Sequence, residues 1–171
     1  NPIRPAILWN DTRTSQEVED IKQNLGLNSL LQLTQNTVLE GFTLPKLMWL
    51  KNNEQDNYKR ISKFMLPKDY IVYKLTGNVY TEPSDAAGTI MFSVKDENWS
   101  TELLHRLNID PSICPEIIAS HQKSGQLTEK VKNSLGIDSN INVYQGGADN
   151  ACGALGSGIT DEQKQLVSIG T

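Results

Sequence analysis

The chain has 171 residues, a net charge of −4 and 37% hydrophobic residues, which suits one domain with enough chain to bury an apolar core. Apolar residues are spread along the whole length, which argues against disorder. No apolar run approaches the roughly 20 residues that span a bilayer, and no signal peptide is evident, so we expect no membrane partner. The mild acidity without basic clusters argues against nucleic acid as a partner.

The two cysteines and the chain ends carry limited information. Cys114 and Cys152 lie far apart without metal-ligand spacing, and we interpret both as buried thiols in a reducing cytosol. The chain begins without methionine and stops after an apolar run and a Gly-Thr pair. We therefore expect it to be a piece of a longer protein.

The first half of the chain mixes apolar runs with helix patterns. Residues 5–9 predict a buried strand, and residues 11–25 predict an amphipathic helix with a polar cap. Residues 43–53 predict a short helix with a proline in its first turn. A second strand is predicted at residues 63–66, and a helix that begins with proline and ends at glycine is predicted at residues 67–77.

The second half continues the alternation. Residues 82–92 predict a loop that leads into a short strand. Helices capped by Ser100 and Thr128 are predicted in the next part of the chain. The last predicted elements are a strand at residues 141–145, a helix of small residues at 149–155 and a final strand at 166–169. Because strands alternate with helices, the sequence predicts an α/β fold.

One stretch, YQGGADNACGALGSG at residues 144–158, is almost stripped of large side chains. A strand, then Gly146 and Gly147, then a helix start is an arrangement that lets a ligand approach the backbone closely. Asp149 lies at or near the helix start. An aspartate at this position is explained either by helix capping alone or by a catalytic role of its carboxylate. The small residues indicate clearance for a ligand or tight packing of the helix. Both interpretations stay open on the residues alone.

The tetrapeptide SIGT at the end of the chain gives a second glycine turn after an apolar run. Gly170 can adopt conformations closed to other residues, and Thr171 offers a hydroxyl and an N–H group to a phosphate. Two such turns about 20 residues apart, one with an acid and one with a hydroxyl, form a more specific pair than either alone.

Histidines and tryptophans are the other candidates for chemistry. His105 lies on an amphipathic helix and His121 in a polar connection, so we expect both at the surface. Trp9, Trp49 and Trp99 each lie in or beside an apolar run, so we expect them to pack in the core rather than stack on a ligand.

Six blocks of the sequence together resemble the FGGY family of carbohydrate kinases, in order and approximate spacing. They are AILWNDTR (6–13), EGFTLPKLMWL (40–50), LPKDYIVYKLTG (66–77), SDAAGT (84–89), GGADNACGALG (146–156) and SIGT (168–171). The resemblance covers essentially the whole chain.

The resemblance implies an incomplete ribonuclease-H-like, actin-type ATPase domain of a two-domain sugar kinase. Residues 1–171 would be the later part of the N-terminal FGGY kinase domain, ending near the start of the C-terminal nucleotide-binding domain. It implies ATP and Mg²⁺ as cofactors, with ligands mostly outside these residues, and no metal ligand within them. It implies a cytoplasmic enzyme, with a homodimer as a possible assembly.

Residue by residue, the resemblance assigns Asp149 as the catalytic base and Asn150 as a contact to the sugar. Gly170 and Thr171 match the start of a phosphate-binding turn for ATP, and Asp85 matches a block that shapes the cleft wall. A further matched block implies structural support: Trp9, Asp11 and Arg13.

Within this resemblance, the blocks SDAAGT and GGADNA are more similar to the family members that act on D-xylulose than to those that act on glycerol or gluconate, which implies transfer to the 5-hydroxyl of D-xylulose. Within the family, another ketose, polyol or sugar acid is the alternative. A non-catalytic sugar-binding domain is the alternative from another class. We expect these residues alone not to phosphorylate a sugar, because most of the nucleotide site lies elsewhere.

Overall fold

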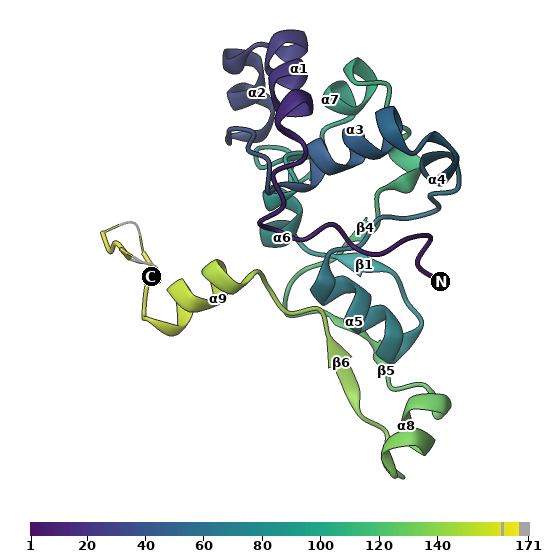
Figure 1. Cartoon of the computed structure of the whole chain (residues 1–171). Helices are drawn as coiled ribbons and strands as arrows, with labels where there is room; N and C mark the ends of the chain where they lie inside the picture. Colours follow the sequence, from purple (N-terminus) through teal and green to yellow (C-terminus); the bar gives the residue numbers. More distant parts are fainter. Residues whose placement is uncertain (162, 168–171) are drawn as a thin grey trace.

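A computed structural model describes residues 1–161 and 163–167 of the chain (Figure 1). Its helices are α1 (Ser15–Leu25), α2 (Leu27–Thr34), α3 (Thr43–Asn53), α4 (Gln55–Lys59), α5 (Pro67–Thr76), α6 (Pro83–Gly88), α7 (Thr101–Arg106), the 3-10 helix η1 (Pro111–Ile113), α8 (Glu129–Leu135) and α9 (Asp149–Gly156). Its strands are β1 (Tyr80–Thr81), β2 (Phe92–Ser93), β3 (Asn98–Trp99), β4 (Glu116–Ile117), β5 (Lys123–Gln126) and β6 (Asn142–Tyr144).

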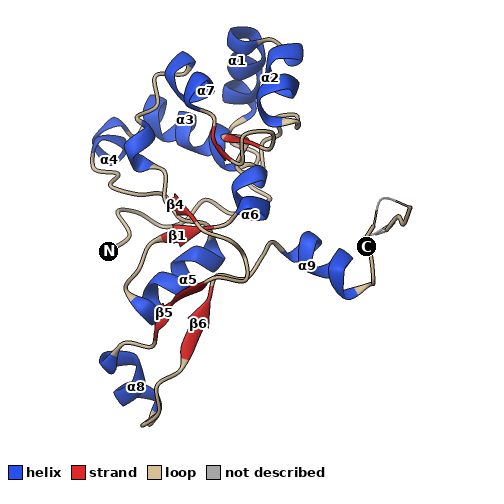
Figure 2. Cartoon of the chain, turned by 180° about the vertical axis from the view of Figure 1, so that it is seen from behind, coloured by secondary structure: helices blue, strands red, loops and turns tan. Residues whose placement is uncertain are grey.

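The elements fall into three parts (Figures 1 and 2). Helices α1, α2, α3 and α7 gather at one end of the molecule, with α6 beneath them. The middle holds α5 beside β1 and β4, and the hairpin of β5 and β6 carries α8 away from it. Helix α9 projects sideways from the body. The turn between β6 and α9 therefore lies where the body ends and the projecting helix begins.

The described residues contain three short two-stranded sheets. Strands β1 and β4 pair in parallel, with Thr81 opposite Ile117. The pairs β2–β3 and β5–β6 are antiparallel. Together with the helices this is the predicted α/β arrangement, although the sheets are small.

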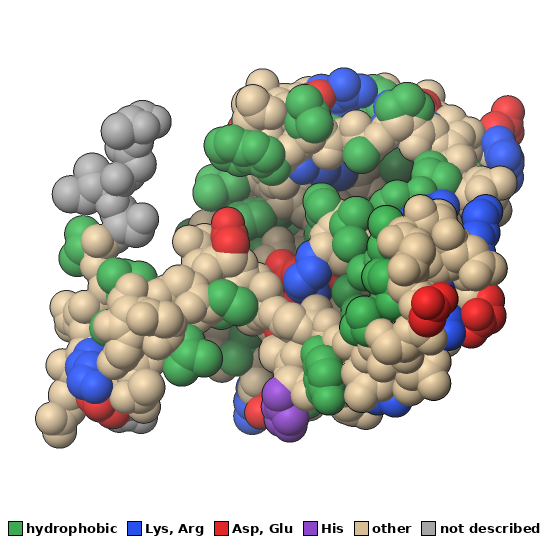
Figure 3. Space-filling view, turned by 90° about the horizontal axis from the view of Figure 1, so that it is seen from below, with side chains coloured by type: hydrophobic (Ala, Val, Ile, Leu, Met, Phe, Trp, Pro, Cys, Tyr) green, Lys and Arg blue, Asp and Glu red, His purple; other side chains and the backbone are tan. Residues whose placement is uncertain are grey.

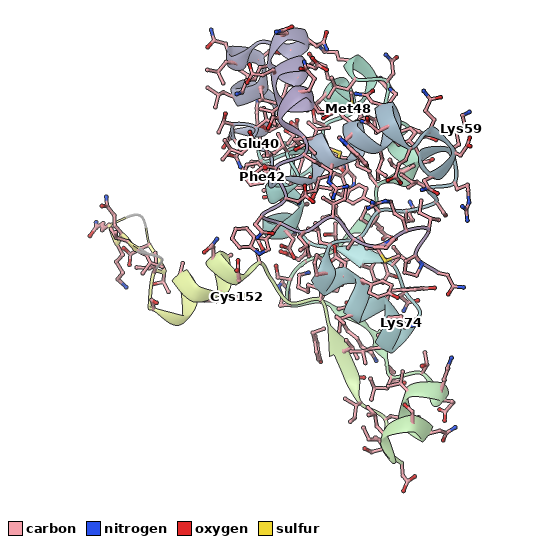
Figure 4. The ribbon with its side chains drawn as sticks, in the orientation of Figure 1. Glu40, Phe42, Met48, Lys59, Lys74 and Cys152 are labelled. Atoms are coloured by element: carbon pink, nitrogen blue, oxygen red, sulfur yellow. The ribbon has the colours of Figure 1, made fainter. Side chains whose placement is uncertain are left out.

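The apolar core lies among α1, α2, α3 and α7. Spacing of three and four residues puts Val18, Ile21 and Leu25 on one face of α1, and all three are buried. They belong to a cluster with Leu30, Val38, Leu44, Leu47, Ile90, Met91, Leu103, Leu104, Leu107, Ile109, Ile113 and Cys114. Phe42 and Met48, labelled in Figure 4, pack against this cluster from α3 and the segment before it.

Local signals set several helix ends as predicted. Helix α5 begins at Pro67 and ends at Gly77, which adopts the left-handed conformation. The hydroxyls of Ser100 and Thr128 accept hydrogen bonds from amides in the first turns of α7 and α8. Gly136 ends α8 in the left-handed conformation.

Other predictions are wrong. Residues 5–9 and 63–66 form no strand, because within residues 1–161 and 163–167 no ladder of backbone hydrogen bonds includes them, although the Phe64 N–H group donates to the Ile113 carbonyl. The predicted loop after residue 82 is helix α6, whose start is held by the buried side chain of Glu82. Helix α1 begins at Ser15, with no side-chain cap. Of the predicted last strand at residues 166–169, residues 166 and 167 form no strand and residues 168 and 169 lie outside the described part.

Two side chains predicted to be buried are exposed. Trp9 is 81% exposed in a turn that the hydrogen bond from the Asp11 N–H group to the Leu8 carbonyl closes. Cys152 lies on exposed α9, whereas Cys114 is buried in the core as expected. Trp99 packs edge-on against Phe64 and Phe92, which confirms its core placement.

Candidate active site

The two glycines before α9 are required by the backbone and by close contacts. Gly146 has φ +73°, in the left-handed region that a side chain rarely adopts. A Cβ on Gly147 would lie 3.1 Å from the Sγ of Cys152 and 3.5 Å from the Oγ of Ser84. By contrast, a Cβ on Gly153 would meet nothing within 4 Å. The backbone conformation therefore explains Gly146, tight packing explains Gly147, and open space surrounds Gly153.

Asp149 is the first residue of α9. The N-cap position is Ala148, and no side chain caps this helix. The Asp149 Oδ1 accepts a hydrogen bond from the N–H group of Asn150 at 2.7 Å, and both residues are exposed. Within residues 1–161 and 163–167 no lysine or arginine pairs with this carboxylate. The acid is thus near the positive end of the helix, with one oxygen open to solvent.

Helix α9 touches the body only near its start. None of its residues is buried, and Cys152, labelled in Figure 4, lies on the part that projects away. Seen from below in Figure 3, the molecule is hollowed, and basic and acidic side chains lie together within the hollow. A separate shallow cavity of about 480 Å³ is lined by residues 52–57 and includes neither Asp149 nor Asn150.

A buried polar cluster lies directly behind the turn. The Lys68 ammonium contacts the carboxylates of Asp69 at 2.9 Å and Asp85 at 3.2 Å. The side-chain amide of Gln145 donates to Asp69 at 2.8 Å and its oxygen accepts from Ser124 at 2.7 Å. Gln145 is 1% exposed, so the residue before the glycines is fixed from both ends of its side chain.

Glu82 is the second centre of this cluster and is fully buried. Its carboxylate accepts from the amides of Ser84 and Asp85, and from the hydroxyls of Ser84 and Ser120. Burial opposes its charge, but the bonds from Ser84 and Ser120 outweigh burial and hold the pKa of Glu82 below its usual value. The cluster therefore contains a buried negative charge satisfied entirely by donors.

The other charged groups of the cluster, Asp85 and Lys68, also have shifted pKa values. Burial raises the pKa of Asp85, and the attraction of Lys68 only partly offsets it. Burial lowers the pKa of Lys68, but its hydrogen bond to Asp69 and its attraction to both aspartates raise it overall. The Asp69 Oδ2 is buried and makes no hydrogen bond. Asp85 therefore takes part in an internal ion pair with Lys68 in this structure.

These acids do not form a magnesium site. The Lys68 ammonium lies among Asp69, Glu82 and Asp85, at the position that a cation between them would occupy. Within the described residues, no three histidine, cysteine, aspartate or glutamate side chains are placed to hold a metal ion. Also within them, no helix has the length and apolar character needed to cross a membrane.

The other predicted residues lie elsewhere. Asp11 and Arg13 form a two-point ion pair, and the Arg13 guanidinium lies 4.9 Å from the ring centre of half-buried Trp49. This pairing holds the pKa of Asp11 at about 2, through the hydrogen bonds from Arg13. Both histidines are exposed, as expected. Two predicted ATP contacts lie outside the described residues: Gly170 and Thr171.

Sequence reasoning missed the polar cluster. Its members come from α5, the start of α6, the β4–β5 connection, β5 and the residue after β6. They are Lys68, Asp69, Glu82, Ser84, Asp85, Ser120, Ser124 and Gln145. One available signal was the pairing of charged and hydroxyl residues in PKDY and EPSD, next to otherwise apolar helix positions.

Residues 1–156 match the N-terminal domain of the FGGY family of carbohydrate kinases, and the chain belongs to this family. It is 97% identical over 171 residues to a xylulose kinase of Staphylococcus xylosus, covering all of this chain and 35% of that protein. It is 46% identical over 170 residues to a xylulose kinase of Lactococcus lactis, covering 99% of this chain and 34% of that protein.

Solved structures give the same picture. Ligand-bound xylulose kinase from Lactobacillus acidophilus superposes with a TM-score of 0.82 at 28% identity, over 89% of this chain and 31% of that chain. The chain thus spans about a third of the length of the curated relatives it matches. The predicted sugar-kinase fold is confirmed, over the N-terminal part of such proteins.

Proposed function

We propose that these residues belong to an enzyme that transfers the γ-phosphoryl group of ATP to the 5-hydroxyl of D-xylulose. The observation that carries the proposal is Asp149, an exposed carboxylate at the first residue of α9, on a turn anchored from behind by buried side chains. The printed names of the relatives, xylulose kinases of 97% and 46% identity, support this sugar over others.

In this reaction the residues of the chain handle the sugar and its proton. Asp149 accepts the proton of the 5-hydroxyl as the oxygen forms its bond to phosphorus and the bond to ADP breaks. The Asn150 side chain, with a donor and an acceptor, suits neighbouring sugar hydroxyls. Mg²⁺ bound with ATP would neutralise the negative charge of the phosphates.

Several further assignments belong to the same proposal. Residues 1–171 form the later part of the N-terminal kinase domain, next to a nucleotide-binding domain, and Gly170 with Thr171 begins a turn that binds ATP phosphate. The Mg²⁺ ligands lie mostly outside these residues, and the cluster of Asp69, Glu82 and Asp85 already holds the Lys68 ammonium. The enzyme works in the cytoplasm, where ATP is available, and assembles as a homodimer.

The role of Asp149 is tested by Asp149→Asn in the full-length protein. The amide cannot take the proton, so we expect kcat to fall by about 10²- to 10⁴-fold, with KM for ATP changed little. Asp138→Asn is the matched control, since Asp138 is also exposed and lies beyond α8. A kcat for Asp149→Asn close to that of the control, with folding intact by circular dichroism, would contradict the assignment.

The substrate is tested separately, by ATP-dependent phosphorylation across a panel of ketoses, polyols and sugar acids. We expect the highest kcat/KM with D-xylulose, and no turnover by residues 1–171 alone. Strong turnover of another panel member with D-xylulose inert would keep the family and overturn the sugar. If the full-length protein binds these sugars but phosphorylates none of them, the result would favour a non-catalytic sugar-binding domain.

A further inference from the structure

The glycine turn is anchored on both sides of its flexible residues. Before the glycines, the Gln145 side chain is held by Asp69 and Ser124, and its N–H group donates to the Gln122 carbonyl at 3.1 Å. Gly146 itself donates to the Ser120 carbonyl at 2.9 Å. After them, the Ala148 N–H group donates to the Ser84 Oγ at 2.9 Å. Because Ala148 is the N-cap of α9, this last bond fixes where the helix starts.

The direction of the Ser84 hydroxyl is set by Glu82. A hydroxyl has one proton and two lone pairs, and an ionised carboxylate can only accept. The Ser84 Oγ lies 2.7 Å from one Glu82 oxygen and 2.8 Å from the other, so its proton is given to Glu82. A lone pair therefore remains for the Ala148 N–H group. A serine without this acid could turn its proton toward Ala148 and lose the bond.

Within the described residues, no side chain from another element besides Ser84 makes a hydrogen bond to the start of α9. The helix has no side-chain cap and no buried residue, so packing does not position it. Two glycines precede it, and glycine backbones are the most permissive of any residue. The distance between Asp149 and a bound hydroxyl thus depends on few contacts.

We propose that Ser84, oriented by Glu82, is a positioning residue for Asp149. It fixes the start of α9 and so the distance from the proposed base to the sugar hydroxyl. This inference rests on the proposed function, since it gives Asp149 a reaction to be positioned for. It assigns no substrate contact to Ser84 itself.

The test is a double-mutant cycle in the full-length kinase with D-xylulose and ATP. Ser84→Ala removes the acceptor, and we expect kcat per folded molecule to fall about 10-fold or more, because displacements near 1 Å cost up to about 100-fold. In an Asp149→Asn background the same change is expected to alter kcat less than about twofold, because the base that it positions is gone. A purely structural role would lower both backgrounds equally.

Companion variants separate position from folding. Ser84→Thr keeps the hydroxyl and is expected to retain kcat within about twofold, whereas Ser84→Cys keeps the size with a weak acceptor and is expected to lose activity. If Ser84→Ala does not fold, the cycle is run with Ser84→Cys. Ser134→Ala, on exposed α8, is the control. Wild-type kcat in folded Ser84→Ala and Ser84→Cys, beside an inactive Asp149→Asn, overturns this inference alone. A wild-type kcat in Asp149→Asn would instead overturn the proposed function, on which this inference rests.

Discussion

The helical core around α1, α3 and α7 and the turn before α9 are held together by opposite kinds of contact. The core is a cluster of buried apolar side chains, whereas the turn rests on a buried network of charges, hydroxyls and an amide. Apolar contacts are non-directional and tolerate small shifts, while hydrogen bonds and ion pairs fix distance and angle. The comparison indicates that the core supplies stability and the polar cluster supplies position.

The largest expected change in stability comes from the core. Leu103 is fully buried, and Leu103→Ala is expected to lower the free energy of unfolding by about 2–5 kcal/mol. Leu135→Ala is the matched control, because Leu135 is 62% exposed and the same change there is expected to stay within about 0.5 kcal/mol. Urea unfolding measures both. Equal losses at the two sites would show that the helical core does not dominate stability.

The polar cluster should respond less, and with a pH dependence. Every hydrogen bond to the Glu82 carboxylate comes from a donor. In Glu82→Gln the NH₂ group, itself a donor, would face one of these donors and leave a polar group unpaired. We expect a loss of about 1–3 kcal/mol at neutral pH. Glu19→Gln, at the exposed pair with Lys22, is the control with no measurable loss.

The sign of the pH dependence follows from the lowered pKa of Glu82. Its contribution is present above the unfolded value near 4.5 and is lost as the pH falls through the folded value. The stability difference between wild type and Glu82→Gln is therefore expected to shrink as the pH falls below about 4.5. A difference that stays constant in acid would mean that the Glu82 charge does not stabilise the turn.

Local features of the fold were predictable from the sequence, because the residues that determine them are neighbours. Pro67 and Gly77 mark the ends of α5, and Ser100 and Thr128 cap their helices through bonds within one turn. Strands were not predictable to the same degree, since an apolar run becomes a strand only with a partner. Trp9 and the run around it have no such partner in the described part, and remain exposed.

The candidate site also contains one part that could be predicted from the sequence and one that could not. Asp149 could be singled out because the acid, the glycines and the helix start are adjacent in the sequence. The cluster behind it could not, because Lys68, Glu82 and Gln145 are far apart in the sequence and meet only in the folded chain. Helix α6 was missed for a related reason: a glutamate with a buried side chain, rather than a serine or aspartate, holds its start.

The smallest expected effects lie in the glycines of the turn and helix, where the same substitution should act in opposite directions. Gly146→Ala forces a side chain into a left-handed conformation and is expected to cost about 1–2 kcal/mol. Gly153→Ala places a methyl group in open space within α9 and is expected to stabilise by about 0.5–1 kcal/mol, because alanine favours helix. Denaturant midpoints of the two variants measure the contrast. If Gly146→Ala were tolerated as well as Gly153→Ala, the turn would not be rigid, and the separation between a stabilising core and a positioning cluster would fail.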